Sequence, residues 1–416
     1  MAATEAKRNL TRPDPAIPLA PVPLPPPGPA RDGREIVRQL MGLTRSGIGG
    51  GGGPGGESRL RLVERIELEG ELWEPEGIVR LAGESGGGGD EGERFWVSAG
   101  EYTVPTKKFP DGKWVGGTDR SAGAGFAHFV VFDGTGKRLG DWVVSKEGDL
   151  EVSFFRSLRS AAPPFSMQGR ACGGKGRLTG TQYHNGGLDY DGQYIWATLS
   201  QYRPNTTGTV VKIDPVALTM EKVFRVGDHQ GGIVHDVETG TLTTLNWGGR
   251  KARRWDLRKG TGVEVWRKEE EQVRLGDAAD GGRGETGRGG GVEREGFNAP
   301  EKEIVNPSYW IDYQDCKSLG RVDGRSLMLC SGIATLAPGV EVGGLAVVDA
   351  EEMVPIWEVP FMERTGARGG GRGEGGEGVL MTKNPMDVAL VGGRVRLYFA
   401  PEEGRSAVFV YEVCEG

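Results

Sequence analysis

Two stretches of this chain repeat one pattern: YHNGGLDYDGQYIW at residues 183–196 and DHQGGIVHDVETGTLTTLNW at residues 228–247. After one leading residue, each has a histidine, an amide residue, two glycines and an apolar residue. Each then continues through an aspartate and a turn into a strand-like run that ends at a tryptophan. The chain has only four histidines, and two of them stand at the same point of this unit. A repeated unit of this size predicts a supersecondary element that stacks against its own copies.

Three further segments align with these two, so the pattern occurs five times. The residues at the first position of the five copies are Glu74, His184, His229, Asn306 and Asn384. About four short runs rich in Val, Ile, Tyr, Trp and Phe follow each of them, separated by Gly, Asp and Pro turns. Four strands per unit, repeated around an axis, are typical of a β-propeller. We therefore predict an all-β fold with five four-stranded blades; the alternative is six blades, with an extra one near residues 102–130.

The two ends of the repeat region suggest how the ring closes. The last copy has three strand-like runs before the chain ends, and RLRLVERIELEG at residues 59–70 is a single strand-like run with no partner beside it in the sequence. We predict that this N-terminal strand is the fourth strand of the last blade. Closure of this kind covers an otherwise unpaired sheet edge.

Composition divides the rest of the chain. Residues 1–58 are rich in Pro and Gly and are expected to be a disordered tail, although 31–44 have the spacing of a short amphipathic helix. The propeller is expected over 59–416. Three segments without β alternation interrupt it as insertions, at 152–182, 269–303 and 364–378.

The segment 152–182 has two interpretations. Its removal brings the first repeat close to the length of the fourth. A Val codon begins with GT and a Gln codon can be CAG, which matches the ends of an intron. One hypothesis is a retained intron, and the other is a genuine loop, of a length that is uncommon inside compact domains.

Charge and hydropathy restrict the partners. The 51 basic and 58 acidic residues give a net charge of −7, which argues against a nucleic-acid partner. We found no apolar run of about 18 residues and no basic-then-apolar leader pattern, so we expect no membrane partner and a cytoplasmic location. Four cysteines do not make a disulfide framework, and Cys316 and Cys330 are expected to be core thiols. The oligomeric state stays open.

The repeat also predicts a site. In a propeller the first strand of each blade lines the central channel, so the first positions of the five copies face one axis. All five residues there are polar. The predicted metal ligands are Glu74, Glu76, His184, His229, Asn306 and Asn384. Imidazole with carboxylate suits Zn, Mn or Fe, whereas carboxylate and amide oxygens alone suit Ca.

Other polar residues near these positions are candidates for further roles. Asp228, His235 and Asp387 are candidate general bases. The candidate ligand-binding residues are Asn185, Gln230, Arg203 and Asn205. The alternative for this whole set is structural, because Asn, Asp and His at the ends of blades often cap strands through hydrogen bonds.

The motifs resemble a fungal and bacterial family of uncharacterised propeller-like proteins, known as a domain of unknown function. The matching stretches include GELWEPEGIVRL, GGTDRSAGAGFAHFVVFD, YHNGGLDYDGQYIWATLSQYRPN, DHQGGIVHD, NPSYWIDYQDC and NPMDVAL, in order over residues 59–413. A more distant resemblance, in architecture, is to gluconolactonase-type and paraoxonase-type propellers. That resemblance implies a divalent metal in the central channel.

These observations lead to one functional hypothesis and one alternative. The hypothesis is a metal-dependent hydrolase of the lactonase or esterase type, with a small-molecule substrate in the central channel and a water made reactive by the metal. The alternative is a non-catalytic propeller that binds a small molecule or a protein.

Overall fold

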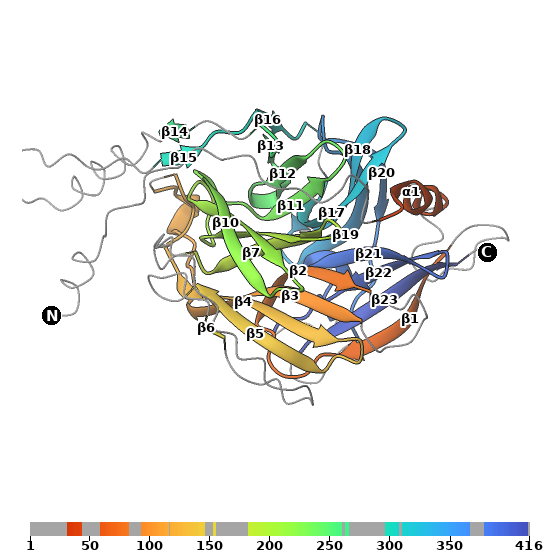
Figure 1. Cartoon of the computed structure of the whole chain (residues 1–416). Helices are drawn as coiled ribbons and strands as arrows, with labels where there is room; N and C mark the ends of the chain where they lie inside the picture. Colours follow the sequence, from red (N-terminus) through yellow and green to blue (C-terminus); the bar gives the residue numbers. More distant parts are fainter. Residues whose placement is uncertain are drawn as a thin grey trace, which may run out of the picture.

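The structure is a computed structural model, and it describes residues 31–43, 59–82, 93–115, 117–145, 153–154, 182–259, 263–265, 296–307, 310–366 and 378–414. Within these ranges five antiparallel sheets surround one axis (Figure 1). Their innermost strands contact one another in order around the ring, and the last contacts the first. The prediction of a five-bladed β-propeller is confirmed. Residues 102–130 belong to the first blade, so the six-bladed alternative is wrong.

The first three blades follow the chain. The first contains β2 (Glu74–Leu81), β3 (Arg94–Val104), β4 (Ala124–Asp133), β5 (Arg138–Ser145) and the short β6 (Ser153–Phe154). The second contains β7 (His184–Tyr190), β8 (Ile195–Ser200), β9 (Gly208–Asp214) and β10 (Thr219–Val226). The third contains β11 (Gly232–Asp236), β12 (Thr241–Leu245), β13 (Lys251–Asp256) and β16 (Lys302–Val305). β14 (Val263–Val265) and β15 (Gly296–Asn298) pair antiparallel as a separate two-stranded sheet.

The last two blades complete the ring. The fourth contains β17 (Asp312–Val322), β18 (Arg325–Ala337), β19 (Val340–Asp349) and β20 (Val354–Pro360). The fifth contains β21 (Met386–Val391), β22 (Arg394–Phe399), β23 (Ala407–Cys414) and β1 (Arg59–Glu67). The helices are α1 (Gly33–Met41), η1 (Pro110–Gly112), η2 (Trp247–Gly249) and η3 (Met381–Lys383). No helix in the described ranges is long and apolar enough to cross a membrane.

Burial along a strand follows its place in the blade. All residues of the second strands β8 and β12 are buried, because neighbouring blades cover both faces of a sheet near the axis. The outermost strand β10 is exposed or partly exposed over its first half and buried over its last three residues. The apolar core accordingly lies between blades, as clusters that each join two or more sheets.

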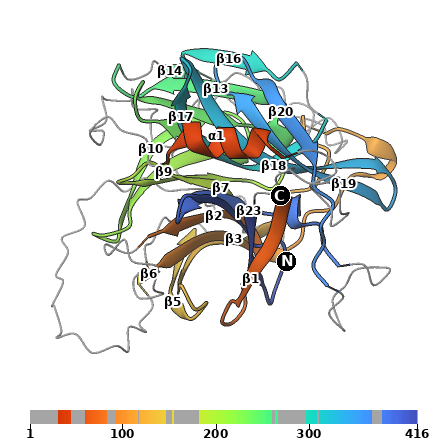
Figure 2. The ribbon, with the colours of Figure 1, turned by 90° about the vertical axis from the view of Figure 1, so that its right-hand side faces the viewer.

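The ring closes through the N-terminal strand. β1 pairs antiparallel with β23 from Arg59 opposite Cys414 to Glu67 opposite Ala407, and Figure 2 shows the two strands side by side. Ile66 of β1 is buried in the cluster that also contains Ile78 of the first blade and Val408 of the fifth. The predicted closure is confirmed, and it joins the fifth blade to the first by both backbone pairing and apolar packing.

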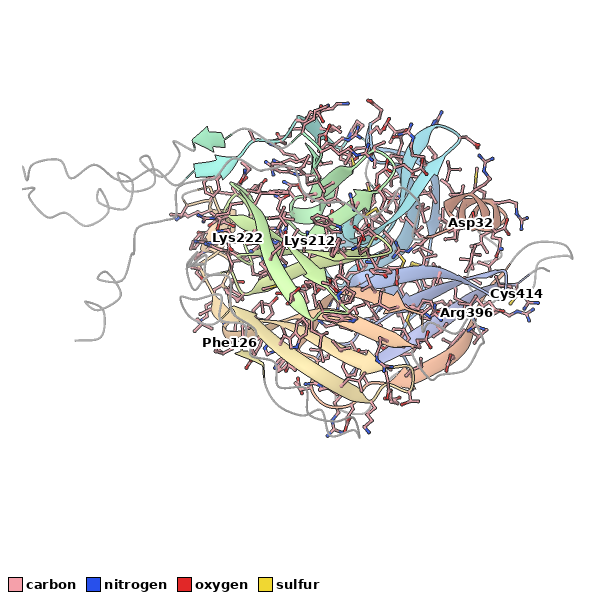
Figure 3. All side chains as sticks on the ribbon, in the orientation of Figure 1. Asp32, Phe126, Lys212, Lys222, Arg396 and Cys414 are labelled. Atoms are coloured by element: carbon pink, nitrogen blue, oxygen red, sulfur yellow. A yellow bond between two sulfur atoms is a disulfide. The ribbon has the colours of Figure 1, made fainter. Side chains whose placement is uncertain are left out.

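A short helix precedes β1 and packs on the outside of the ring. Asp32, labelled in Figure 3, caps α1: its side chain accepts a hydrogen bond from the Glu35 backbone N–H at 3.1 Å. The apolar face of α1, including Ile36 and Leu40, is buried against the fourth and fifth blades. The predicted amphipathic helix is therefore present within the range 1–58.

Charged groups fill the central axis away from the first positions of the repeats. Lys317 of β17 is fully buried. Its Nζ lies 2.6 Å from Asp315 Oδ2 and donates to the Leu188 carbonyl at 2.5 Å. Burial raises the pKa of Asp315 to about 7, and Lys317 opposes that shift. The pair links the fourth blade to the second at the centre of the ring.

Arg31 makes a second axial link. Its guanidinium lies 3.0 Å from Asp189 Oδ1 and 2.9 Å from Asp387 Oδ1, which belong to the second and fifth blades. It also donates to the Ser318 carbonyl of the fourth blade at 3.3 Å. Only 8% of the Arg31 side chain is exposed. A residue that precedes the propeller in sequence therefore binds three of its blades.

The expectation of free core thiols at Cys316 and Cys330 is wrong. The two residues lie directly opposite each other on β17 and β18, with Cα atoms 4.1 Å apart, and form a disulfide. Facing positions on neighbouring antiparallel strands bring Cβ atoms close enough for a bridge. The separation of 14 residues in sequence spans a hairpin, and this geometry becomes visible only once the strand register is known.

Parts of the predicted insertions lie outside the described residues. This is so for 155–181, 266–295 and 367–377, and the retained-intron hypothesis for 152–182 stays a prediction. The described residues at the two ends of 152–182 belong to blades. Phe154 pairs with Trp142 in the first blade, and Gln182 hydrogen-bonds Thr207 and Thr209 in the second. β16, at the end of the range 269–303, is the outer strand of the third blade.

We predict that the closing strand β1 stabilises the propeller through the buried side chain of Ile66. Ile66→Ala removes apolar contacts between the fifth and first blades and should lower the free energy of unfolding by roughly 2–5 kcal/mol in urea titrations. Val63→Ala is the matched control, because Val63 is 46% exposed on the same strand. Equal losses in the two variants would contradict the role given to this interface.

The axial role of Arg31 gives a second prediction. Arg31→Met leaves Asp189 and Asp387 buried without their cation, which typically costs about 3–5 kcal/mol. Arg34→Met is the control, because Arg34 pairs with Asp323 where both side chains are more than 70% exposed. Urea unfolding should separate the variants clearly, and a stable Arg31→Met protein would show that the axis does not depend on this residue.

Candidate functional site

Three predicted metal ligands meet at the start of the first two blades. Glu74 and Glu76 lie on β2 and His184 begins β7; one ligand atom from each lies within 4.8 Å of the other two. The proximity of Glu74 and Glu76 does not follow from simple strand alternation, because Glu76 is the extra residue of a bulge. A β-bulge between Pro75 and Gly77 bends the strand at this point. We call Glu74, Glu76 and His184 the acidic triad.

Tyr102 from β3 connects the members of the triad. Its hydroxyl lies 2.9 Å from His184 Nδ1 and also hydrogen-bonds Glu74. The same His184 nitrogen lies 3.6 Å from Glu76 Oε1. Burial, together with the charges of Glu74 and Glu76, raises the pKa of Tyr102 well above its usual value. The hydroxyl therefore stays protonated and can orient both partners at neutral pH.

The carboxylates of the triad are electrostatically uncompensated. Burial raises the pKa of Glu74 to about 7, and Glu403 of the fifth blade adds to the shift. Burial followed by repulsion from Glu74 raises the pKa of Glu76 well above its usual value. In the described part of the chain neither carboxylate forms an ion pair with Lys or Arg, although Lys383 acts on Glu74 at a distance. This pattern differs from the rest of the axis, where Lys317 and Arg31 bind the acids.

His229 lies beside the triad, and its imidazole lacks a hydrogen-bonding partner among the described residues. Its ring centroid is 5.3 Å from that of His184, and only 2% of the residue is exposed. Neither of its ring nitrogens has a partner among the described residues. Burial, assisted by Arg120, lowers its pKa to about 3, and burial lowers the pKa of His184 as well. Both imidazoles are thus neutral at neutral pH, the form that binds metals.

Aromatic rings surround the two histidines. Tyr202 packs on His184 with centroids 4.5 Å apart, and Trp247 packs on His229 at 4.8 Å. Tyr102 contacts Tyr183 at 5.5 Å and Tyr202 at 5.4 Å, and Tyr202 contacts Trp247 at 5.2 Å. These four residues, Tyr102, Tyr183, Tyr202 and Trp247, form what we call the aromatic collar. Its residues come from the first three blades.

The two predicted asparagine ligands, Asn306 and Asn384, donate hydrogen bonds to backbone carbonyls. The Asn306 amide donates to the Gly249 carbonyl at 3.1 Å. The Asn384 amide donates to the Pro401 carbonyl at 2.9 Å. Their side-chain N–H groups thus satisfy backbone carbonyls, as in the structural alternative for these positions. The acidic triad includes neither residue.

Asp228 and two candidate binding residues hold the loops around the site. Asp228 Oδ1 accepts the backbone N–H of His229 at 2.8 Å and of Asn205 at 3.1 Å, and its Oδ2 lies 3.1 Å from Arg253. Asn205 donates from its amide to the Gly117 carbonyl at 2.8 Å. The Gln230 amide nitrogen donates to the His229 carbonyl at 2.6 Å. These contacts fix the backbone on either side of His229.

Asn185 and its neighbouring glycines form a tight contact between blades. The Asn185 amide donates to the His128 carbonyl of the first blade at 2.6 Å. Gly187 donates to the Gly231 carbonyl of the third blade at 2.9 Å. A Cβ on Gly187 would lie 2.3 Å from Asp315 Oδ1, so the axial ion pair needs glycine here. The repeated Gly-Gly sequence therefore brings backbones together near the axis.

His235 and Asp387, predicted as candidate bases, are engaged in other contacts. His235 Nδ1 lies 2.8 Å from Asp191 Oδ2, and the ring packs on Trp196. Asp387 binds Arg31 and accepts the Arg80 backbone N–H at 2.6 Å. Arg203, in contrast, follows Tyr202 of the collar directly in sequence and lies in the same loop.

Several residues at the site were not singled out from the sequence. Tyr102, Tyr202, Arg120 and Glu403 lie outside the repeated motif, and Trp247 ends one copy of it. The guanidinium of Arg120 lies 4.5 Å from the Trp247 ring centroid and 5.3 Å from that of Tyr202. A signal was available for Tyr202, because it precedes Arg203 in the segment already chosen as a binding loop.

The comparisons with known proteins concern the family and the fold. A family model described as a family of unknown function, DUF6454, matches residues 165–279 and 286–415, more than half of the chain. The first matched segment begins within the range 152–182. No curated protein matches the sequence.

Three solved structures resemble the chain at low identity. A DUF4221 family member from Bacteroides vulgatus is 8% identical, with 86% of this chain and 99% of that chain covered and a TM-score of 0.30. A luciferin-regenerating enzyme is 8% identical, with 84% and 94% covered and a TM-score of 0.33. The WD40 domain of Toxoplasma gondii coronin is 7% identical, with 83% and 89% covered and a TM-score of 0.31. At these TM-scores the likenesses carry no argument about function.

Proposed function

The chain belongs to the family of unknown function DUF6454, and we propose, from the geometry of its site, that it is a metal-dependent hydrolase acting on lactones or esters. Glu74, Glu76 and His184 would hold one divalent cation at the start of the first two blades. His229 would supply a fourth ligand, its second nitrogen donor, or a hydrogen bond beside it. The substrate would lie against the aromatic collar.

The observation that carries this proposal is the uncompensated pair of carboxylates. Two carboxylates about 5 Å apart would, if both were ionised, repel by roughly 3 kcal/mol at an effective dielectric constant of about 20, and burial adds to that penalty. Their raised pKa values accordingly favour protonated carboxyls in the absence of a cation. Elsewhere on the axis the protein supplies Lys317 and Arg31 as counter-ions. At the triad it supplies a neutral imidazole. A divalent cation would neutralise both carboxylates and use the imidazole as a ligand.

The donor set favours a transition metal over calcium. Carboxylate oxygens with one or two imidazole nitrogens suit Zn, Mn or Fe, whereas calcium takes six to eight oxygen ligands. Three protein ligands leave a coordination position open, as in catalytic zinc sites. The ring nitrogens of His229 support this assignment, because they have no hydrogen-bonding partner among the described residues and are available to a cation.

The surrounding residues suit hydrolysis of a polarised carbonyl. A bound divalent metal makes water a better nucleophile and polarises an ester or lactone carbonyl. Tyr102 keeps its proton and can donate it to an oxygen that gains charge. The collar rings are partly buried and limit the access of bulk water to the triad. A non-catalytic binding function remains the alternative when a ligand binds without turnover.

Metal content is the test of this proposal. Purified full-length protein should bind one Zn or Mn per chain, measured by elemental analysis and by competition with a chromophoric chelator. Glu76→Gln keeps the size of the side chain but removes its charge and should weaken binding more than about 100-fold, beyond the loss typical for a residue that only orients a ligand. His184→Ala should have a comparable effect.

Asn306→Ala and Asn384→Ala are the matched controls, since both asparagines stand at first positions of repeats and bind backbone carbonyls. They should keep the full metal content. Hydrolysis of a panel of γ-lactones, δ-lactones and p-nitrophenyl esters should require the metal and fall with Glu76→Gln. Metal-free protein that is unchanged in stability by both triad substitutions would overturn the proposal, and metal binding without hydrolysis would favour the non-catalytic alternative.

A further inference from the structure

The aromatic collar presents a surface for a flat or ring-shaped group next to the triad. Tyr102, Tyr202 and Trp247 are partly exposed, while Tyr183 is buried behind them. Their edges and faces form one continuous set of ring contacts from the first blade to the third. Aromatic side chains of this kind contact rings of a ligand by stacking or by edge-to-face packing. A ring held here would place its substituent near His184 and His229.

Arg120 supports the collar and has its own counter-ion. Its Nε and Nη2 lie 2.8 and 3.0 Å from the two carboxylate oxygens of Asp119. Its guanidinium packs on Trp247 and Tyr202. A bidentate pair of this kind already uses the charge and the parallel donors of the arginine. Arg120 therefore stiffens the collar from within.

Arg203 differs because no carboxylate binds it in the described part of the chain. Its Nε donates to the Gln201 amide oxygen at 2.8 Å, and its backbone N–H donates to the Gln201 carbonyl at 2.7 Å. Thr206 donates its hydroxyl to the Arg203 carbonyl at 2.9 Å. Burial lowers the pKa of the guanidinium, and Tyr183 of the collar opposes the shift. The loop is thus fixed locally, while a half-buried positive charge remains beside the collar.

The loop is also anchored to its neighbours on both sides. The Asn205 backbone binds Asp228, and its amide binds the Gly117 carbonyl of the first blade. Arg203 is therefore presented from a loop whose position is set by the first and third blades. A guanidinium held in this way loses little conformational freedom when it binds an anion.

We propose that the ligand of this site carries a carboxylate attached to a ring, with the ring on the aromatic collar and the carboxylate on Arg203. This inference rests on the proposed function, since the collar borders the acidic triad, and it narrows the substrate class to anionic ring-containing esters or lactones. The triad itself offers no positive charge to an anion until a cation binds. Arg203 supplies the attraction that such a substrate needs away from the metal.

The test compares benzoate with benzamide, two ring compounds of nearly the same shape that differ in charge. Calorimetric titrations use the metal-free full-length protein, so that no metal can bind the carboxylate. We expect benzoate to bind at least about tenfold more tightly than benzamide, the ratio that one charge-assisted bidentate contact provides. Arg203→Gln should bring the two affinities within about twofold, and Arg203→Lys should restore part of the preference. Arg34→Gln is the control, because Arg34 is an exposed arginine on α1.

The outcomes separate this inference from the metal site. Equal binding of benzoate and benzamide, or a preference that survives Arg203→Gln in a folded variant, overturns the inference while leaving zinc binding to be judged by itself. A preference that depends on Arg203 supports it, and it does so even in a protein that fails to bind zinc. Repeating the titrations with zinc-loaded protein shows whether the same arginine acts when the triad is neutralised.

Discussion

Arg31 joins carboxylates of the second and fifth blades, which are not neighbours on the ring, and reaches a carbonyl of the fourth. A propeller is held mainly by contacts between adjacent blades. A link across the axis therefore connects two blades that otherwise interact only through the blades between them. The same N-terminal segment continues through α1, which packs on the fourth and fifth blades, to β1, which completes the fifth. One continuous piece of chain thus reaches the ring at its centre and at its rim.

This arrangement explains why the two groups of axial acids differ. Asp189, Asp315 and Asp387 each bind a cation that belongs to the protein, so their charges contribute to cohesion. Glu74 and Glu76 have no such partner in the described ranges and lie beside Tyr102 of the collar. A buried acid pair without a counter-ion lowers stability unless a ligand compensates it. This contrast indicates that the three paired aspartates stabilise the fold. It supports the unpaired Glu74 and Glu76 as the position where a cation binds.

The sequence was sufficient for the architecture because the architecture depends on repetition. Five copies of one pattern, and a lone strand at 59–70, specified the blades and the closure through β1. The repeat was less informative about the site, since it equates positions that the structure treats differently. Asn306 and Asn384 align with His184 yet donate to backbone carbonyls, and His235 binds Asp191. Tyr102 reaches the triad from the second strand of its blade, and only the β2–β3 pairing shows that proximity.

The unequal use of the five first positions has a geometric reason. Five residues around one axis could share one cation, but Asn306 and Asn384 donate to backbone carbonyls and are not part of the triad, so the site draws its ligands from neighbouring blades. Glu74, Glu76, His184 and His229 come from the first three blades, and the collar comes from the same three. A cation bound there would be held by residues of the first two blades, with His229 of the third blade beside it. The asparagines of the fourth and fifth blades use their amides for hydrogen bonds to backbone carbonyls, which would leave cation binding to residues of the first three blades.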